Sequence, residues 1–280
     1  STCMTTQFYA PPSSIRGQRL ILDGDEAKHI AKSLRMEPGD RIQVVDGQGK
    51  RYTVELSHVR PKQVVGVVRE TVEGAGEPPY RLTVGLGLLK NRSRFETFLE
   101  KAAECGVHRV VPLLTERTEV QSLREKRSTN ILTAAVKQCG RSVLPDLAAP
   151  TAMDEMLSAF SREDRSAAIG WIAHEAASAP VLPEAVRSFR RETEKERVQQ
   201  SDQAEPRDRE SLSNRPELTV LVGPEGGFSD QEIQAAADAG MQPVRLGPHR
   251  LRAETAGIVA ASAVSMAFAA GERPEDAAFL

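Results

Sequence analysis

Two glycine-rich loops in the C-terminal third of the chain have the residue types needed to bind a ligand. The first loop covers residues 223–229 and reads Gly-Pro-Glu-Gly-Gly-Phe-Ser, and the second covers residues 247–252 and reads Gly-Pro-His-Arg-Leu-Arg. Glycine lets a backbone turn sharply and approach a ligand closely, and proline fixes one φ angle. Each loop follows an apolar run, so two loops of this kind can line one pocket.

Neither loop carries the signature of a phosphate site. The chain has no G-x-x-x-x-G-K-[ST] segment, and no G-x-G-x-x-G segment follows an apolar run. The sequence therefore argues against a P-loop and against a standard dinucleotide site. A single Gly-Pro-Glu-Gly-Gly segment is more often just a tight turn. The presence of the second loop favours a binding site over that simpler interpretation.

The residues around both loops predict a strand before each loop and a helix after it. Residues 218–222 form a short apolar run that suits a strand buried on both faces. Ser229 and Glu232 form a capping box, so a helix should begin there and end at Gly240. The pattern repeats with a strand over residues 242–246 and a helix over residues 254–270.

The middle of the chain predicts further alternation of strands and helices. Residues 81–89 and 109–114 read as strands on either side of a helix capped by Ser93 and ended by Gly106. A helix from about residue 129 to residue 140 and a strand over residues 166–173 should follow. Such alternation is typical of a mostly parallel sheet.

The N-terminal residues predict a separate, β-rich module. Residues 41–45 and 52–56 alternate polar and apolar types around a turn, and residues 63–68 continue the pattern. We expect domains over residues 1–72 and 81–280, joined by a turn-rich linker over residues 73–80. Within the second domain, residues 187–216 are highly charged and poor in apolar types, so they predict a disordered or partly helical insertion.

The two loops together resemble the cofactor-binding end of the SPOUT, or trefoil-knot, methyltransferases. Within them, the chain resembles the ribosomal RNA small subunit methyltransferase E family. The resemblance also rests on residues 101–107, 112–117 and 138–141. It covers nearly the whole chain apart from the insertion. It implies an α/β SPOUT-type domain with a C-terminal trefoil knot and a mostly parallel sheet, preceded by a small PUA-like β-barrel domain.

The resemblance implies that S-adenosyl-L-methionine donates a methyl group to N3 of a uridine in 16S ribosomal RNA. The small ribosomal subunit and a second copy of the chain, in a homodimer, are the implied partners. S-adenosyl-L-methionine has no phosphate and needs backbone groups and an apolar wall, which the two loops offer. The implied cofactor-binding residues are Leu221, Gly223, Pro224, Glu225, Gly226, Leu246, Gly247, Pro248, Leu251 and Thr255.

Transfer to N3 requires removal of its proton and stabilisation of the charge that develops on the uracil carbonyls. Arg252 is the first candidate for the stabilising cation, and its guanidinium could instead reach the carboxylate of the cofactor's methionine part; Arg141 is the second candidate. Glu254 is a candidate base, although a glutamate at a helix start also serves as a partner of the helix dipole. The candidate RNA-binding residues lie in basic stretches and are Arg35, Lys90, Arg94 and Arg117.

The charge distribution is compatible with RNA binding despite a net charge of −2. Residues 1–72 carry 11 basic against 8 acidic side chains, and residues 81–127 carry 10 against 6, so the basic excess is local. Phosphate attraction depends on where charge sits. An ordinary solvated surface explains the same excess equally well.

Composition sets the remaining expectations. Three cysteines without C-x-x-C spacing argue against a disulfide framework and a structural zinc site. We therefore expect a reducing, cytoplasmic setting. No apolar run reaches the length of a membrane span, and no basic stretch followed by an apolar run suggests export, so we expect a soluble protein. Two alternatives stay open. One is a SPOUT methyltransferase that acts on transfer RNA or on a ribose 2′-hydroxyl. The other is an RNA-binding protein without catalytic activity.

Overall fold

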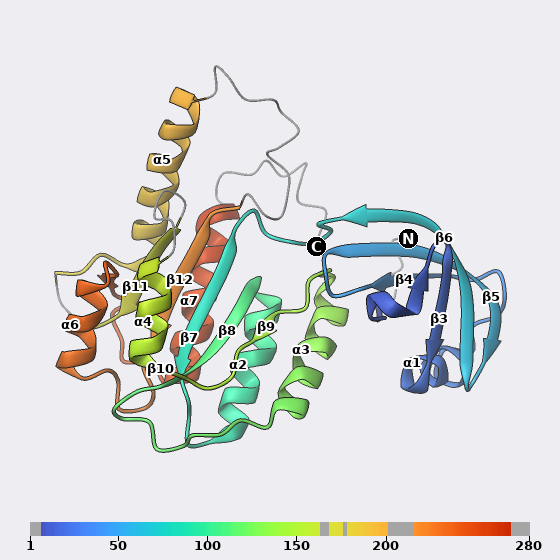
Figure 1. The fold of residues 1–280 in the computed structure, drawn as a ribbon, viewed down its shortest axis with the longest axis horizontal. Helices are drawn as coiled ribbons and strands as arrows, with labels where there is room; N and C mark the ends of the chain where they lie inside the picture. The colour runs from blue at the N-terminus through green and yellow to red at the C-terminus, as the bar shows by residue number, and fades with distance from the viewer. Residues whose placement is uncertain (1–6, 163–167, 176–177, 201–214, 270–280) are drawn as a thin grey trace. The chain divides into compact units, whose positions relative to one another are not determined.

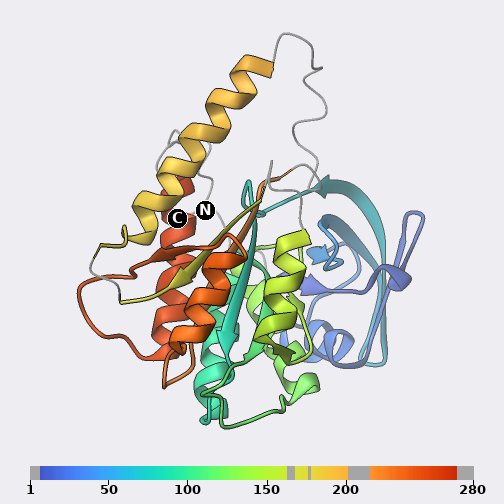
Figure 2. The ribbon, with the colours of Figure 1, turned by 60° about the vertical axis from the view of Figure 1, so that its left-hand side comes forward.

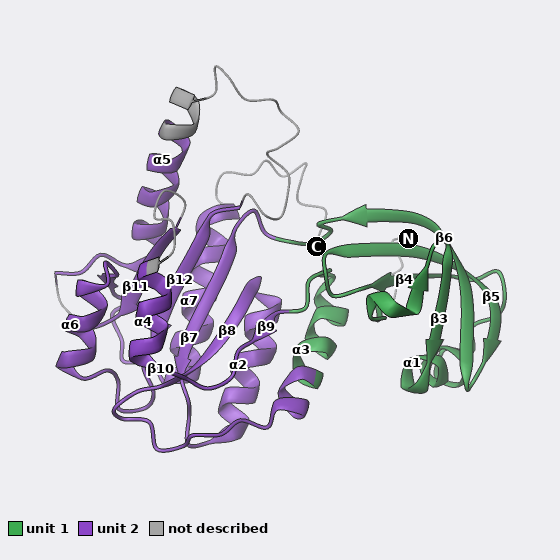
Figure 3. Ribbon diagram, viewed as in Figure 1, with its two compact units in different colours: residues 1–77, 130–144 green, residues 78–129, 145–280 purple. Residues whose placement is uncertain are grey.

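A computed structural model of the chain describes residues 7–162, 168–175, 178–200 and 215–269. The chain divides into two compact units, shown in different colours in Figure 3. Unit 1 contains residues 1–77 and 130–144, and unit 2 contains residues 78–129 and 145–280. The chain therefore returns to unit 1 after it has begun unit 2. The boundary lies within helix α3 (Glu125–Cys139), whose residues up to 129 belong to unit 2 and whose residues from 130 belong to unit 1.

Unit 1 is built on a six-stranded sheet with the order β1-β4-β5-β6-β3-β2. The predicted hairpin strands are present, and two of them are longer than the alternating pattern indicated, because β5 and β6 each extend over 11 residues. The β-rich module expected at the N-terminus is thus confirmed. Its elements are β1 (Gln7–Tyr9), a 3-10 turn (Pro12–Ser14), β2 (Ile15–Arg16), β3 (Arg19–Asp23), α1 (Gly24–Lys28), a π-helical turn (His29–Ser33), β4 (Arg41–Val45), β5 (Lys50–Arg60) and β6 (Gln63–Glu73).

The core of unit 1 is apolar, and polar contacts attach residues 130–144 to it. Phe8, Leu20 and Ile42 are among its fully buried side chains. The Gln7 side-chain amide is also buried, and it donates to the backbone carbonyls of Val136 at 3.2 Å and Arg141 at 2.8 Å. The second half of α3 is therefore part of this unit's interior.

Unit 1 contains a buried ion pair between Arg141 and Glu77. The Arg141 guanidinium donates to the Glu77 carboxylate at 2.8 Å, and both side chains are less than 5% exposed, at 4% and 3%. The same carboxylate accepts the backbone N–H groups of Ser142 at 2.9 Å and Val143 at 2.8 Å. Charge and hydrogen-bonding capacity are thus matched at this site, as a buried pair requires.

Arg141→Leu is expected to lower the free energy of unfolding by about 3–5 kcal/mol, because it leaves the Glu77 carboxylate buried without its counter-charge. Urea unfolding measures the change. The control is Arg109→Leu, which removes an exposed pair with Asp146 (3.2 Å, side chains 51% and 63% exposed) and should cost less than about 1 kcal/mol. Equal losses in the two variants would contradict a structural role for the Arg141 pair.

Unit 2 is a parallel α/β sheet with the order β10-β8-β7-β12-β11-β13, and β9 pairs with β8. Every pair in this sheet is parallel. The predicted mostly parallel sheet is therefore confirmed. Its elements are β7 (Arg81–Gly87), α2 (Arg92–Glu104), β8 (Val107–Leu114), the start of α3, β9 (Asp146–Leu147), β10 (Thr151–Ala152), α4 (Met153–Arg162), β11 (Ala168–Ala173), α5 (Leu182–Gln200), β12 (Glu217–Val222), α6 (Asp230–Asp238), β13 (Gln242–Val244) and α7 (Ala253–Ala269).

Helices cover both faces of this sheet, as Figures 1 and 2 show. Helix α7 packs against α2, α5, β7 and β12 on one face, and α4 and α6 pack together on the other. Leu113 and Leu221 on the strands and Phe160 on α4 belong to the apolar cluster of the second face. Gly257 lets α7 approach α2 closely, because a Cβ there would lie 2.7 Å from the Phe98 ring. The sheet is therefore buried on both sides, and its strand ends lie at the rim.

Several local predictions can be compared with these bounds. The capping box of Ser229 and Glu232 is confirmed at the start of α6. The predicted cap of α2 is wrong, because the Asn91 side chain accepts from the Ser93 backbone N–H and α2 begins at Arg92. Helix α3 begins four residues before the predicted start. Helix α5 covers residues up to 200 of the predicted insertion, and residues 201–214 lie outside the described part of the chain.

Candidate functional site

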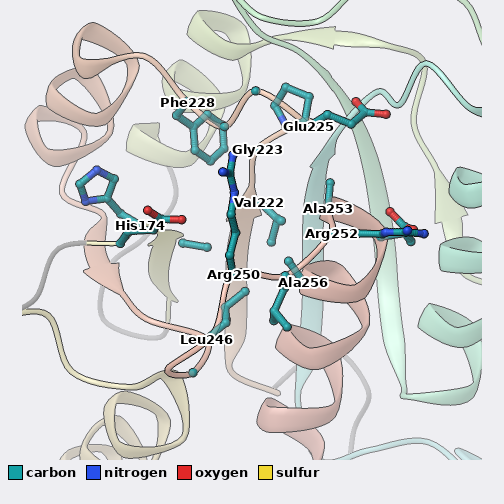
Figure 4. A pocket seen from close by; sticks show the side chains of 18 of the residues that line it. His174, Val222, Gly223, Glu225, Phe228, Leu246, Arg250, Arg252, Ala253 and Ala256 are labelled. Atoms are coloured by element: carbon teal, nitrogen blue, oxygen red, sulfur yellow. The ribbon is translucent and has the colours of Figure 1, made fainter.

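The candidate site lies at the carboxyl ends of three neighbouring strands of unit 2. Strand β11 pairs in parallel with β12 on one side and with β13 on the other, so the ends of all three strands meet at one edge. Ligands of open α/β sheets bind at this edge. The three strand ends lead into residues 222–228, 245–254 and 173–175, which line a cavity of about 1000 Å³ (Figure 4).

The first glycine loop is a tight turn with no room for a side chain at its first residue. A Cβ on Gly223 would lie 2.8 Å from the Gly227 carbonyl carbon and 3.0 Å from the Phe228 nitrogen. The turn is closed by a hydrogen bond from the Gly227 N–H to the Pro224 carbonyl at 2.9 Å, with Gly227 at φ +69°. Backbone atoms therefore form this wall of the cavity.

The second glycine loop connects β13 to α7 and contains several cations. The Arg245 guanidinium donates to the Ala179 carbonyl at 2.8 Å, and the Arg252 carbonyl accepts the first helical bond of α7 from the Ala256 N–H at 2.7 Å. The side chains of Arg250 and Arg252 are exposed, and among the described residues neither guanidinium has a hydrogen-bond or ion-pair partner. The loop therefore brings unpaired positive charge to the cavity.

A buried carboxylate with an unused oxygen lies in the same cavity. Glu254 is in the first turn of α7 and only 9% exposed. Its Oε1 lies 3.6 Å from Arg94 Nε, which is an ion-pair distance, while its buried Oε2 has no hydrogen-bond partner within the described residues. An unsatisfied buried carboxylate oxygen is costly for folding. A catalytic role is one physical explanation for such a group.

The four candidate RNA-binding residues have different surroundings. Arg117 donates to the Gly226 carbonyl at 2.7 Å and lines the cavity, as does Arg94. Lys90 lies 2.8 Å from Glu119, and this carboxylate raises the pKa of the Lys90 ammonium through a hydrogen bond and its charge. Arg35, in unit 1, is exposed at φ +52°. The cavity thus contains two of the four, and the other two lie elsewhere.

Most of the candidate cofactor and catalytic residues lie in this cavity. Leu221 is fully buried in β12 and belongs to the apolar cluster beneath it, and Thr255 is not part of the lining. Arg141 belongs to unit 1 and is held by Glu77. The candidates that line the cavity are Gly223, Pro224, Glu225, Gly226, Leu246, Gly247, Pro248, Leu251, Arg252 and Glu254.

The cavity also contains residues that the sequence did not indicate, at the β11 end and among the loop side chains. The strand itself was predicted, and the rule that parallel strands end at one edge could have added His174 and Glu175 to the site. Nothing in the sequence distinguished Phe228 or Arg250 from their loop neighbours. The additional lining residues are Ala173, His174, Glu175, Val222, Gly227, Phe228, Arg245, His249, Arg250, Ala253 and Ala256.

No helix within the described ranges is long and apolar enough to cross a membrane.

Comparisons with known proteins identify the domains that this chain contains. Residues 76–265 match the RNA methyltransferase domain family, and residues 22–69 match the RNA methyltransferase PUA domain. The ribosomal RNA small subunit methyltransferase E of Synechocystis sp. is 28% identical over 268 residues, which cover 95% of this chain and 78% of the relative. The Bacillus subtilis protein of the same name is 26% identical over 250 residues, which cover 87% and 88%.

Solved structures are similar over nearly the whole chain. A putative methyltransferase from Legionella pneumophila, in complex with the bound cofactor SAM, is 31% identical with a TM-score of 0.70 and covers 95% of this chain and 98% of its own. A ribosomal RNA small subunit methyltransferase E from Neisseria gonorrhoeae, bound to S-adenosyl methionine, has a TM-score of 0.73 over 94% and 97%. At 24% identity, the second likeness concerns the fold.

Proposed function

This chain belongs to the RNA methyltransferase family, and on that premise we propose that it transfers the methyl group of S-adenosyl-L-methionine to N3 of a uridine in 16S ribosomal RNA. Methylation of ribosomal RNA is supported by the relatives named ribosomal RNA small subunit methyltransferase E.

The observation that carries the proposal is the meeting of the two glycine loops in one cavity. The Gly223 turn offers backbone atoms where any side chain would collide, and Phe228, Leu246 and Leu251 supply apolar walls. These features fit S-adenosyl-L-methionine, whose adenine is read by backbone groups. The volume of about 1000 Å³ is at the upper end of the range for small-molecule sites, about 300–1000 Å³. A cofactor and an unpaired base therefore fit together.

When bound, the cofactor supplies a methyl group on a positively charged sulfur. The part of the chain in the reaction is to hold N3 of the uracil in line with that methyl and to take away the N3 proton. We assign the proton to the Glu254 carboxylate, because Glu254 lines the cavity and its buried Oε2 has no hydrogen-bond partner among the described residues. The N3–H bond would break as the carboxylate becomes a carboxylic acid, and the electron pair left on N3 would form the N3–CH₃ bond. The bond between sulfur and the methyl group would break at the same time, and its electron pair would stay on the sulfur of the leaving S-adenosyl-L-homocysteine.

Arg252 is proposed to stabilise the negative charge that develops on a uracil carbonyl oxygen. Its guanidinium has no partner among the described residues and lies beside the first turn of α7, in the same cavity as Glu254. Arg141 is a weaker candidate for this role, because its guanidinium is engaged by Glu77 inside unit 1.

Arg252→Lys is expected to lower kcat about a hundredfold while cofactor affinity changes little. Lysine keeps the positive charge but loses the planar fork, and one donor to a developing oxyanion contributes about 2.7–4 kcal/mol. Steady-state methyl transfer at saturating substrate measures kcat, and calorimetry with S-adenosyl-L-methionine measures affinity. Near-normal turnover, or a loss confined to cofactor binding, would rule out this role.

RNA contacts are proposed for Arg35 in unit 1 and for Lys90, Arg94 and Arg117 in unit 2. Of these four residues, Arg35 has the strongest structural support for RNA contact. Its φ angle lies in the left-handed region, which costs a non-glycine residue energy, and such backbone strain is often kept at functional sites. Reaching N3 also requires an unpaired or flipped base, since N3 is engaged in Watson–Crick pairs. Cations around the cavity mouth would hold the flanking phosphates.

The remaining parts of the proposal rest on the family. We propose that unit 2 contains a C-terminal trefoil knot, that the chain acts as a cytoplasmic homodimer, and that its substrate is 16S ribosomal RNA or the small subunit. The exposed Met266 on α7, which shows 72% of its surface, supports a partner surface there.

The experiment that tests the substrate is transfer of labelled methyl groups by the purified chain. Unmodified small subunits, free 16S ribosomal RNA and bulk transfer RNA are offered separately with labelled S-adenosyl-L-methionine. We expect label in the ribosomal RNA. Label in transfer RNA would favour the alternative SPOUT activity, and RNA binding without transfer to any substrate would favour a non-catalytic protein.

A further inference from the structure

The cavity contains more positive charge than the proposed chemistry uses. Of the arginines that line it, Arg94 is paired with Glu254, Arg117 donates to the Gly226 carbonyl, and Arg245 donates to the Ala179 carbonyl. Arg250 and Arg252 have no partner in the described part of the chain. Arg252 is assigned to the uracil, so one unpaired cation, Arg250, has no assigned ligand.

Arg250 and Arg252 lie in different parts of the cavity. In Figure 4 the Arg250 side chain runs from the second glycine loop toward Gly223 and Phe228 of the first loop. Arg252 lies beside Ala253, where α7 begins. The two arginine side chains therefore reach different parts of the cavity. Arg250 lies between the two loops that bind the cofactor, and Arg252 lies at the helix that carries Glu254.

A cation in this place attracts an anionic ligand group. The cofactor carries one anionic group, the α-carboxylate of its methionine part, together with a cationic ammonium and a cationic sulfonium. A guanidinium binds a carboxylate through two parallel N–H donors, which are stronger than neutral hydrogen bonds. The lining carboxylates, Glu175, Glu225 and Glu254, have the wrong sign for this group.

We propose that Arg250 binds the α-carboxylate of S-adenosyl-L-methionine and so anchors the methionine end of the cofactor between the two glycine loops. This inference rests on the proposed cofactor. It assigns to Arg250 a role in binding and orientation, separate from the role of Arg252 at the uracil.

The test compares two ligands that differ only in this group, S-adenosyl-L-methionine and its decarboxylated form, by calorimetry on the 280-residue chain. Arg250→Leu should weaken binding of S-adenosyl-L-methionine about 10- to 100-fold, the range for one hydrogen-bonded contact to a charged group. It should leave the affinity for the decarboxylated ligand nearly unchanged. Arg250→Lys should recover part of the loss, because it restores the charge without the fork.

Two matched variants serve as controls. Arg252→Leu makes the same substitution two residues along the same loop and should leave the ratio of the two affinities unchanged. Arg187→Leu makes it at an exposed residue of α5 outside the cavity lining and should leave both affinities unchanged. Melting temperatures of the variants report whether each one folds.

Three results would overturn the inference. Arg250→Leu could bind S-adenosyl-L-methionine as tightly as the wild type, and a loss of RNA affinity alone would then identify a phosphate as the ligand of Arg250. The variant could weaken both ligands equally, which would show an effect that does not involve the carboxylate. A wild-type chain that binds neither ligand would refute the proposed cofactor, and this inference with it.

Discussion

Gly223→Val is expected to abolish binding of S-adenosyl-L-methionine while the protein still unfolds in a cooperative transition. A Cβ at this residue would lie 2.8 Å from the Gly227 carbonyl carbon and 3.0 Å from the Phe228 nitrogen, both of them backbone atoms that cannot rotate away. The first glycine loop must therefore move, and the backbone wall of the cavity moves with it. Calorimetry measures the binding, and thermal unfolding measures the integrity of the fold.

Gly223→Ala sharpens this test, because it introduces the same Cβ without the two further methyl groups of valine. We expect a smaller but clear loss of affinity in the alanine variant, and no detectable heat in the valine variant. The effect is local, because the loop lies at the surface end of β12 while the core beneath it is formed by residues such as Leu221 and Phe160. Unchanged affinity in the valine variant would refute the cofactor site.

Glu254→Gln is expected to lower kcat by about 10²- to 10⁴-fold, the usual contribution of a general base, with little change in cofactor affinity. Glutamine has the same shape but cannot accept the N3 proton as a carboxylate does. Stability should change by less than about 1 kcal/mol, the size of a lost helix-dipole interaction. Single-turnover transfer, calorimetry and thermal unfolding separate these three effects.

The pH dependence of the variant distinguishes a base from a structural residue. Without a base, transfer proceeds only on the fraction of uridine that is already ionised, so the residual kcat of Glu254→Gln should rise about tenfold per pH unit over the range in which uridine is mostly neutral. The wild type should show a shallower dependence. If kcat of the wild type and of the variant depends on pH in the same way, or if lower stability alone explains the loss of kcat, Glu254 is only a partner of the helix dipole and not the base.

The fold class could be predicted from the sequence because local signals and the global fold agree in this chain. The apolar run before Gly223 predicted a strand buried on both faces, and β12 is the central strand between β7 and β11. Ser229 and Glu232 predicted the start of α6 through side-chain contacts between residues three apart. Interactions between residues this close in the chain can be predicted from a single sequence.

The parts that could not be predicted depend on contacts distant in sequence. Nothing near residues 130–144 indicates that Gln7 and Glu77 hold them inside unit 1. The N-cap of α2 at Asn91 could not be predicted, because Ser93 is an equally good cap and only the backbone conformation decides between them. Within the described ranges, Arg250 and Glu254 Oε2 have no partner, and this depends on which side chains the fold brings near them, which no spacing rule predicts.

Mass spectrometry of nucleosides from the modified RNA tests the central claim most directly. Small subunits whose 16S ribosomal RNA lacks the modification are incubated with the purified chain and S-adenosyl-L-methionine, and the RNA is digested and compared with synthetic standards. The proposed function predicts one new product, uridine methylated at N3, which is absent when the Gly223→Val variant is used. A ribose 2′-O-methyl nucleoside, or a methylated base other than uracil, would contradict it.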